Sequence, residues 1–156
     1  MTAAWGTGQQ AIRRRLDTGE LDRVSGSAAD GEFLLTEARH RCASARTIRQ
    51  SDPTGAYVMA YECGRHTATA LLTQQGLRAT EQSGHHAVVI ESVIEQFGPE
   101  RFGQLSGMRR RRHTLEYPRN SSETAVTVEE VDEAIDYVEG LLEAAEMLLP
   151  KLGLWS

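Results

Sequence analysis

Apolar residues recur at intervals of three and four along most of the chain, which is the spacing of one face of an α-helix. The pattern is most regular between residues 127 and 150, with apolar positions Val128, Val131, Ile135, Val138, Leu142, Ala145 and Leu149. Thr127 and Glu130 have the spacing of an N-terminal capping box, and Pro150 cannot continue a helix. These features predict a long helix over 127–150.

Four further helices are predicted from the same periodicity and from the residues that interrupt it. They cover residues 34–50, 53–76, 85–97 and 99–117. Asp52 and Pro53 suit the N-cap and the first turn of the second of these helices. Gly98 suits the C-terminal cap of the third, and Pro118 ends the fourth. The helix over 53–76 has apolar residues on two sides, which predicts that it lies at the centre of the fold.

The first thirty residues have fewer apolar positions. Ile12 and Leu16 mark one short amphipathic stretch, and Leu21 and Val24 mark another. We expect one or two short helices here, packed loosely on the rest of the chain and joined to it by a polar linker over 25–30. Alternation typical of β-strands is not apparent. The sequence therefore predicts an all-α fold: an antiparallel up-and-down bundle of about five helices over 31–150, with an N-terminal appendage at 1–30 and a tail at 151–156.

Composition indicates the number of domains and the cellular compartment. A chain of 156 residues with 40% hydrophobic content suits one domain with a core of its own. The N-terminal residues lack the apolar segment of a secretory signal, and no apolar run approaches the roughly 18 residues that span a bilayer. We therefore expect a cytoplasmic protein without a membrane partner. Cys42 and Cys63 lie singly within helical patterns, which favours reduced core residues over a disulfide or a metal site.

The strongest chemical feature is a run of four arginines, residues 109–112, followed directly by His113. It lies in the second half of the predicted helix 99–117, in a chain whose net charge is -5. A solvated helix face is the simplest interpretation of a charge run. A local basic cluster on an acidic protein can also attract phosphate without making the whole surface basic. Glu116 and Tyr117 complete the segment before Pro118.

Three motifs occur in order along the predicted helices. The second helix contains Ala56-Tyr57-x-x-x-Tyr61-x-x-x-Arg65-x-x-x-x-Ala70-Leu71, the third opens with Gly84-His85-His86, and the fourth closes with Arg112-His113-x-x-x-Tyr117-Pro118. Together with the order of the helices, they resemble the HEPN superfamily (higher eukaryotes and prokaryotes nucleotide-binding). The resemblance covers about residues 31–150. It is nearest to the compact bacterial members, and the Ala- and Arg-rich composition suggests the actinobacterial branch.

The resemblance implies a homodimer in which the motifs of two subunits face each other across a cleft. In active members of the family, an Arg is followed by a polar residue and then, a few positions later, by a His. The resemblance implies that the His accepts the proton of a ribose 2′-OH, and that the Arg stabilises the charge on the scissile phosphate without a metal or other cofactor.

Two alignments of this motif are open. In the first, Arg112 is the arginine, His113 is the polar residue and Tyr117 takes the place of the usual His. A tyrosine is a weak base at neutral pH, although it can donate a hydrogen bond to phosphate. In the second alignment His113 is the catalytic His and Arg109 lies one turn before it, with a spacing one residue short of the family minimum. The sequence thus supports the fold more strongly than it supports nuclease activity.

Other polar residues are candidates for the same site. His85 and His86 either cap the third helix or lie in the cleft with Arg112, and a zinc site from these two and His113 is the weakest alternative. Glu116 either forms an ordinary intrahelical pair with Arg112 or orients its guanidinium for phosphate. Glu62 and Arg65 of the second helix could meet Arg112 across the bundle.

Two functions follow from the resemblance. One is an endoribonuclease, the toxin of a toxin–antitoxin pair or part of a phage-defence system, with a nucleotidyltransferase-type antitoxin as partner. The other is a catalytically inactive dimer that binds nucleotide, RNA or a protein.

Overall fold

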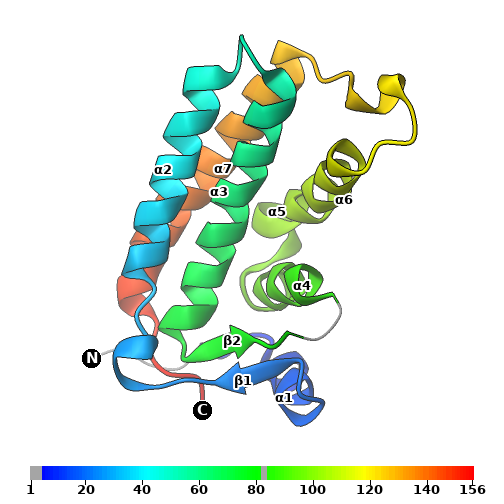
Figure 1. Ribbon diagram of the computed structural model, residues 1–156. Coiled ribbons are helices and arrows are strands. Elements are labelled where there is room, and N and C mark those ends of the chain that lie inside the picture. The colour runs from blue at the N-terminus through cyan, green and yellow to red at the C-terminus, as the bar shows by residue number, and fades with distance from the viewer. Residues whose placement is uncertain (1–4, 82–83) are drawn as a thin grey trace.

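The computed structural model describes residues 5–81 and 84–156, so residues 1–4 of the expected appendage lie outside the described part of the chain. The protein is mainly helical, as predicted (Figure 1). Its helices are α1 (Gln9–Asp17), α2 (Glu32–Ile48), α3 (Pro53–Gln74), α4 (His85–Phe97), α5 (Pro99–Phe102), α6 (Gln104–Glu116) and α7 (Val128–Leu148), with single 3₁₀ turns η1 (Gly26–Ala28), η2 (Ser121–Thr124) and η3 (Leu149–Lys151).

The predicted helix starts are confirmed by their capping contacts. The Asp52 carboxylate accepts a hydrogen bond of 2.9 Å from the Gly55 backbone N–H, and the Thr127 hydroxyl oxygen accepts one of 3.1 Å from the Glu130 N–H. Each side chain satisfies a backbone donor that the first turn would leave unpaired. The carboxylate of Glu130 binds Arg111 instead of completing the capping box.

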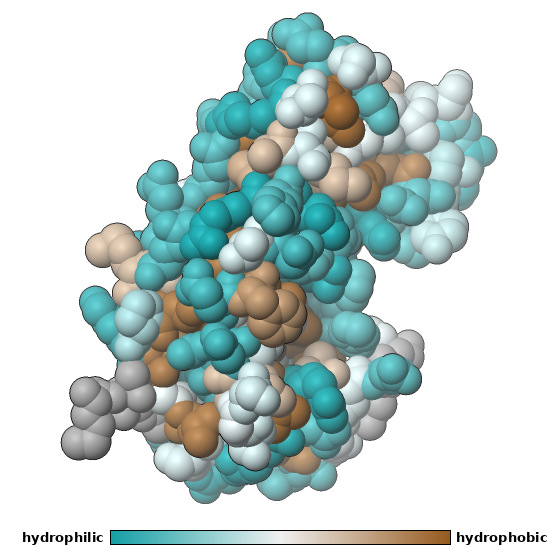
Figure 2. Space-filling model, turned by 60° about the vertical axis from the view of Figure 1, so that its left-hand side comes forward, coloured by the Kyte–Doolittle hydropathy of each residue, from teal (hydrophilic) through white to brown (hydrophobic). Residues whose placement is uncertain are grey.

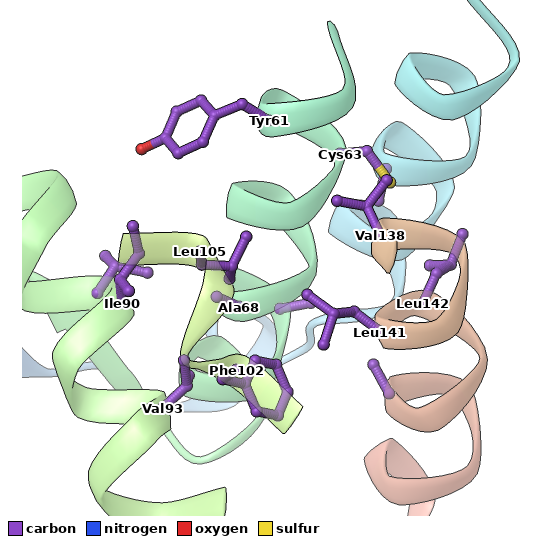
Figure 3. Packing of buried hydrophobic residues seen from close by; sticks show 14 of the residues in the cluster. Tyr61, Cys63, Ala68, Ile90, Val93, Phe102, Leu105, Val138, Leu141 and Leu142 are labelled. Atoms are coloured by element: carbon purple, nitrogen blue, oxygen red, sulfur yellow. The ribbon is translucent and has the colours of Figure 1, made fainter. Parts of the chain in front are cut away.

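Helix α3 occupies the centre of the fold, as its two apolar faces predicted. It packs against α2 and α7 on one side and against α4 and α6 on the other. Figure 3 shows the two halves of the core: Cys63 lies on the side of Val138, Leu141 and Leu142, and Tyr61 points to the opposite side, where Ile90, Val93, Phe102 and Leu105 lie. Cys42 and Cys63 are both free and buried, which confirms their interpretation as core residues.

The helices that follow α3 are arranged less regularly than a simple up-and-down bundle. Helices α2, α3 and α7 lie side by side, whereas α4 is seen nearly end-on in Figure 1 and so runs across them. The single helix expected over 99–117 is divided at Gly103 into α5 and α6. Gly64 lets α6 approach α3 closely, because a Cβ at this position would lie 2.5 Å from Leu105 Cδ2. This contact holds the first turn of α6 against α3.

The N-terminal segment differs from the sequence prediction in two respects. Residues Leu21–Arg23 form strand β1, not a helix, and pair antiparallel with strand β2 (Leu77–Ala79), so the fold contains a small sheet that the sequence analysis missed. The segment is also packed tightly, because Ile12 and Leu21 are fully buried in the core. Each strand has three residues, which is too short for alternation to be recognised.

One buried arginine joins this segment to α4. Arg15 is 6% exposed and binds the carboxylates of Glu20, Glu91 and Glu95 at 2.6, 3.1 and 2.7 Å. The hydrogen bond and charge of Glu95, followed by those of Glu20, raise its pKa above the ordinary value against the opposing effect of burial. Helix α1 is therefore attached to α4 by a charged network as well as by apolar packing.

The surface has no continuous apolar face in the view of Figure 2, where hydrophobic patches are separated by hydrophilic residues. The large apolar side chains that are exposed, among the described residues, are Phe33, Tyr117, Met147 and Leu154. Within residues 5–81 and 84–156, none of the helices has both the length and the hydropathy needed to cross a membrane.

Candidate anion-binding site

The four arginines of α6 point in different directions, because successive residues of a helix are turned by about 100°. Arg111 faces α7 and the loop before it. Its guanidinium lies 2.9 Å from the Glu130 carboxylate and donates to the backbone carbonyls of Glu123 and Ala125 at 3.1 and 3.4 Å. Arg111 therefore has a structural role: it holds the loop between α6 and α7 against both helices.

Arg112 lies toward the opposite edge of the buried face, where α6 packs against α3 and α4. Its Nε atom is shielded from solvent and has no hydrogen-bond partner among the described residues. Glu116 Oε1 is 4.0 Å away, which is too far for a hydrogen bond. The rest of the side chain is partly accessible, since its exposed fraction is 28%. Leaving a buried donor unpaired costs about 1–3 kcal/mol, so Arg112 is poised for an acceptor that the described residues do not supply.

Helix α3 supplies Tyr61, Glu62 and Arg65 to the same region. Arg65 donates from Nε and Nη2 to Glu62 Oε2 at 3.0 and 2.5 Å, and both side chains are largely buried. Burial alone would raise the pKa of Glu62. The hydrogen bonds and charge of Arg65, with smaller contributions from His66 and Arg112, outweigh burial and lower it. The charge of Arg112 thus acts on Glu62, although the closest partner of this carboxylate is Arg65.

Helix α4 contributes His86, whose Nδ1 is 3.4 Å from the Tyr61 hydroxyl. Burial, together with the charges of Arg65, His85 and Arg112, lowers the pKa of His86 to about 4 against the opposing effect of Glu62. Burial also raises the pKa of Tyr61 to about 12. At neutral pH the imidazole is therefore uncharged and the phenol is protonated. Both can take part in hydrogen bonds without adding charge.

We call the group formed by Tyr61, Glu62, Arg65, His86 and Arg112 the junction site, because it lies where α3, α4 and α6 meet. Its two guanidinium groups are balanced by one buried carboxylate and, at a longer distance, by Glu116. Arg109 adds a further positive charge nearby, since it opposes the rise in the pKa of Tyr61. The arrangement favours an anion with several acceptor atoms, because guanidinium groups bind such anions in a bidentate manner.

A small hollow adjoins the junction site on the side of the sheet. Its volume is about 100 Å³, and its polar lining comes from Arg65, Thr69, Thr73, Arg78 and His85. Arg65 therefore belongs to both the junction site and the hollow. Arg78 lies 3.7 Å from Asp22, and both side chains are exposed. The hollow thus adds Arg78 and His85 to the polar groups that lie beside Arg65.

The structure separates the residues that the sequence motif places together. Arg112 lies in the junction site, whereas His113 and Tyr117 lie on the solvent side of α6, with their rings 5.0 Å apart between centroids. Tyr117 is 67% exposed. His85 and His86 are also separated, because His86 faces Tyr61 and His85 lines the hollow. The cations and the exposed His–Tyr pair thus form neighbouring but distinct parts of the surface.

Sequence reasoning did not identify the hollow or the contact between Tyr61 and His86. One signal was present, because Tyr61, Arg65 and Thr69 are spaced four residues apart and so lie on one face of α3. Arg78 follows α3 in strand β2, which had not been predicted. Within the described residues, no cluster of three or more His, Cys, Asp or Glu side chains is arranged to hold a metal ion.

Comparison of the chain with models of protein families, with curated proteins and with solved structures finds no significant match. The function is therefore proposed from the residues and their geometry.

Proposed function

We propose that the protein is a HEPN-like homodimer that binds RNA through the phosphate backbone, using the junction site. The observation that carries the proposal is the buried, unpartnered Nε of Arg112 beside the guanidinium of Arg65 and the neutral ring of His86. Phosphate oxygens are good acceptors for guanidinium groups, and the uncharged imidazole adds no repulsion to the two arginines.

The charge distribution supports a local contact over a broad one. The chain has a net charge of -5, so it lacks the extended positive surface that wraps a duplex. Arg109 and Arg112 of α6 and Arg65 of α3 are instead grouped around Tyr61 and Glu62, where α6 meets α3 and α4. Such a site suits one or two phosphates of a flexible single strand, which can bend into the position that the arginines require.

The test is the affinity for a short fluorescent single-stranded RNA, measured by anisotropy at fixed salt. Arg112→Ala should weaken binding about tenfold or more, because a charge-assisted hydrogen bond contributes about 1.5–3 kcal/mol. Arg112→Lys should restore the charge but not the affinity, since an ammonium group does not reproduce the fork of a guanidinium. Arg110→Ala is the matched control, because Arg110 is exposed on the same helix. Equal losses in the Arg112 and Arg110 variants would contradict the proposal.

A second candidate is metal-independent RNA cleavage, in which the junction site holds a phosphate and a group on the solvent side of α6 accepts the 2′-OH proton. The pair His113 and Tyr117 favours it, because both side chains are exposed on the helix that carries the arginine run. Such an enzyme would act as a toxin or in phage defence, with a nucleotidyltransferase-type antitoxin as its partner.

An RNA-cleavage assay on a gel in the presence of a chelator, with the Arg112 variants and with substitutions of His113 and Tyr117, separates the two candidates. Cleavage lost in His113→Ala and retained in Tyr117→Phe would identify His113 as the base. Cleavage created or increased by Tyr117→His, with a 2′,3′-cyclic phosphate product, would place the base at position 117. If RNA binding depends on Arg112 and no variant cleaves RNA, the protein is an RNA-binding module and not a nuclease.

A further inference from the structure

A hollow with an apolar floor lies away from the junction site, where the ends of α4 and α7 meet α5. Its volume is about 330 Å³, and it is lined by Trp5 and by residues of α4, α5, α7 and η3. None of these residues belongs to the junction site. The hollow is therefore a separate feature of the surface, which the proposed function does not use.

Three aromatic rings form one wall of this hollow. The ring centroids of Trp5 and Phe97 are 5.1 Å apart, and those of Phe97 and Phe102 are 6.1 Å apart. The Trp5 indole N–H donates a 2.7 Å hydrogen bond to the backbone carbonyl of Gln96. The polar atom of the indole is thus already satisfied by the protein, and what the ring offers to a ligand is its apolar surface.

Helix α7 forms the other wall with apolar side chains of different sizes. Ala144 leaves space, Leu148 is partly buried, and Met147 has 73% of its surface exposed. Methionine is unbranched and polarisable, so it adapts to the shape of a bound apolar group. An exposed methionine beside three aromatic rings is typical of a surface that accepts an apolar ligand.

The charged residues of the hollow have one sign. Arg101 and Lys151 are exposed at its rim, and neither forms an ion pair with another described residue. No carboxylate is found among the described residues that line the hollow. In a chain with net charge -5, two unpaired cations beside an apolar wall select a ligand with a negative head group and an apolar body.

We propose that this hollow binds a small amphipathic carboxylate, with its hydrocarbon part against Trp5, Phe97 and Met147 and its carboxylate between Arg101 and Lys151. The volume sets the size of the ligand. A water molecule occupies about 30 Å³ of liquid, so the hollow holds on the order of ten non-hydrogen atoms. Octanoate has this size and is the probe of choice.

The experiment is a titration of the full chain with octanoate, followed by the indole N–H resonances in ¹H–¹⁵N NMR spectra, with Trp5→Phe used to assign the Trp5 signal. The Trp5 signal should shift in a saturable manner with a dissociation constant on the order of 1 mM or below. Octanol, which has the chain without the charge, should bind at least about tenfold more weakly. Octylammonium, with the opposite charge, should not bind.

Three variants locate the site. Ala144→Phe fills the hollow and should abolish binding, whereas Arg101→Gln with Lys151→Gln should weaken octanoate about tenfold and leave octanol unchanged. Arg110→Gln removes one exposed cation elsewhere and should have no effect. Equal binding of octanoate and octanol, or unchanged binding in Ala144→Phe while the variant remains folded, would overturn the proposal. RNA affinity should not change with octanoate, so the two proposals fail independently.

Discussion

His86 is kept uncharged by its surroundings, and this has a consequence for stability. Burial, with the charges of Arg65, His85 and Arg112, lowers the pKa of its imidazole from 6.5 to about 4. The unfolded chain therefore binds a proton at this position in the interval between those two values, where the folded chain does not. The linkage relation then requires the free energy of unfolding to fall as the pH decreases through this interval.

We expect His86→Asn to reduce this pH dependence between pH 6.5 and 4, because asparagine does not titrate. The measurement is urea unfolding at a series of pH values, with His40→Asn as control, since the His40 side chain is 66% exposed. If His86→Asn and the unsubstituted protein lose stability in parallel as the pH falls, the proposed environment of His86 is wrong.

Bound RNA should raise the pKa of His86, because a phosphate placed beside Arg112 would offset the positive charge near the imidazole.

At the residue scale, the sequence could indicate which side chains matter but not which of them meet. Arg112 was a candidate because of the run in which it lies, and its helical neighbours could be derived from the 100° turn per residue. Whether Arg112 lies close to His86 depends on the angle at which α4 crosses α3 and α6. Hydrophobic periodicity in a single sequence does not predict that angle. The same holds for Arg111, whose role follows from a loop that folds back to Glu123 and Ala125.

Helix α1 is attached through Arg15, and this contact should contribute strongly to stability. Removing the guanidinium would leave the carboxylates of Glu20, Glu91 and Glu95 close together without a cation. We expect Arg15→Met to lower the free energy of unfolding by about 3 kcal/mol, as for other buried ion pairs that lose one partner. Urea unfolding monitored by circular dichroism at pH 7 measures the change.

The matched control is Arg119→Met, which removes a cation whose side chain is 89% exposed and pairs with Glu123 at 3.0 Å. An exposed pair contributes about 0–1 kcal/mol, so this substitution should have little effect. A loss for Arg15→Met no larger than that of the control would show that the network does not hold α1 in place.

At the scale of elements, the long helices were predictable and the short elements were not. Helices α2, α3 and α7 each contain several turns, so their apolar positions repeat often enough to be recognised. Strands β1 and β2 contain three residues each, and their pairing joins positions 21–23 to 77–79, far apart in the chain. The break between α5 and α6 at Gly103 was also not predicted. Long-range pairing and a single-residue break leave no periodic signal.

At the scale of the whole molecule, the proposed homodimer needs a surface that brings two junction sites together. Tyr117 is 67% exposed at the C-terminal end of α6, beside His113 and close to the arginine run. Phe33, at 61% exposure, lies near the start of α2, at the other end of the long helices. A two-fold axis near Tyr117 would bring two junction sites to one cleft, because a symmetric interface uses the same surface twice.

We therefore expect a dimer at micromolar concentration, with a mass twice the 17.2 kDa of the chain by light scattering. Tyr117→Asp should shift the equilibrium to monomer, because it places two carboxylates beside the two-fold axis, at the edge of the cleft, and removes two aromatic contacts. Phe33→Asp makes the same change in charge at the other end and should leave the dimer intact. A monomer in the unsubstituted protein, or a dimer dissociated by Phe33→Asp alone, would contradict this arrangement. RNA affinity of the Tyr117→Asp monomer then shows whether binding needs both sites, since two linked sites bind one strand more tightly than a single site does.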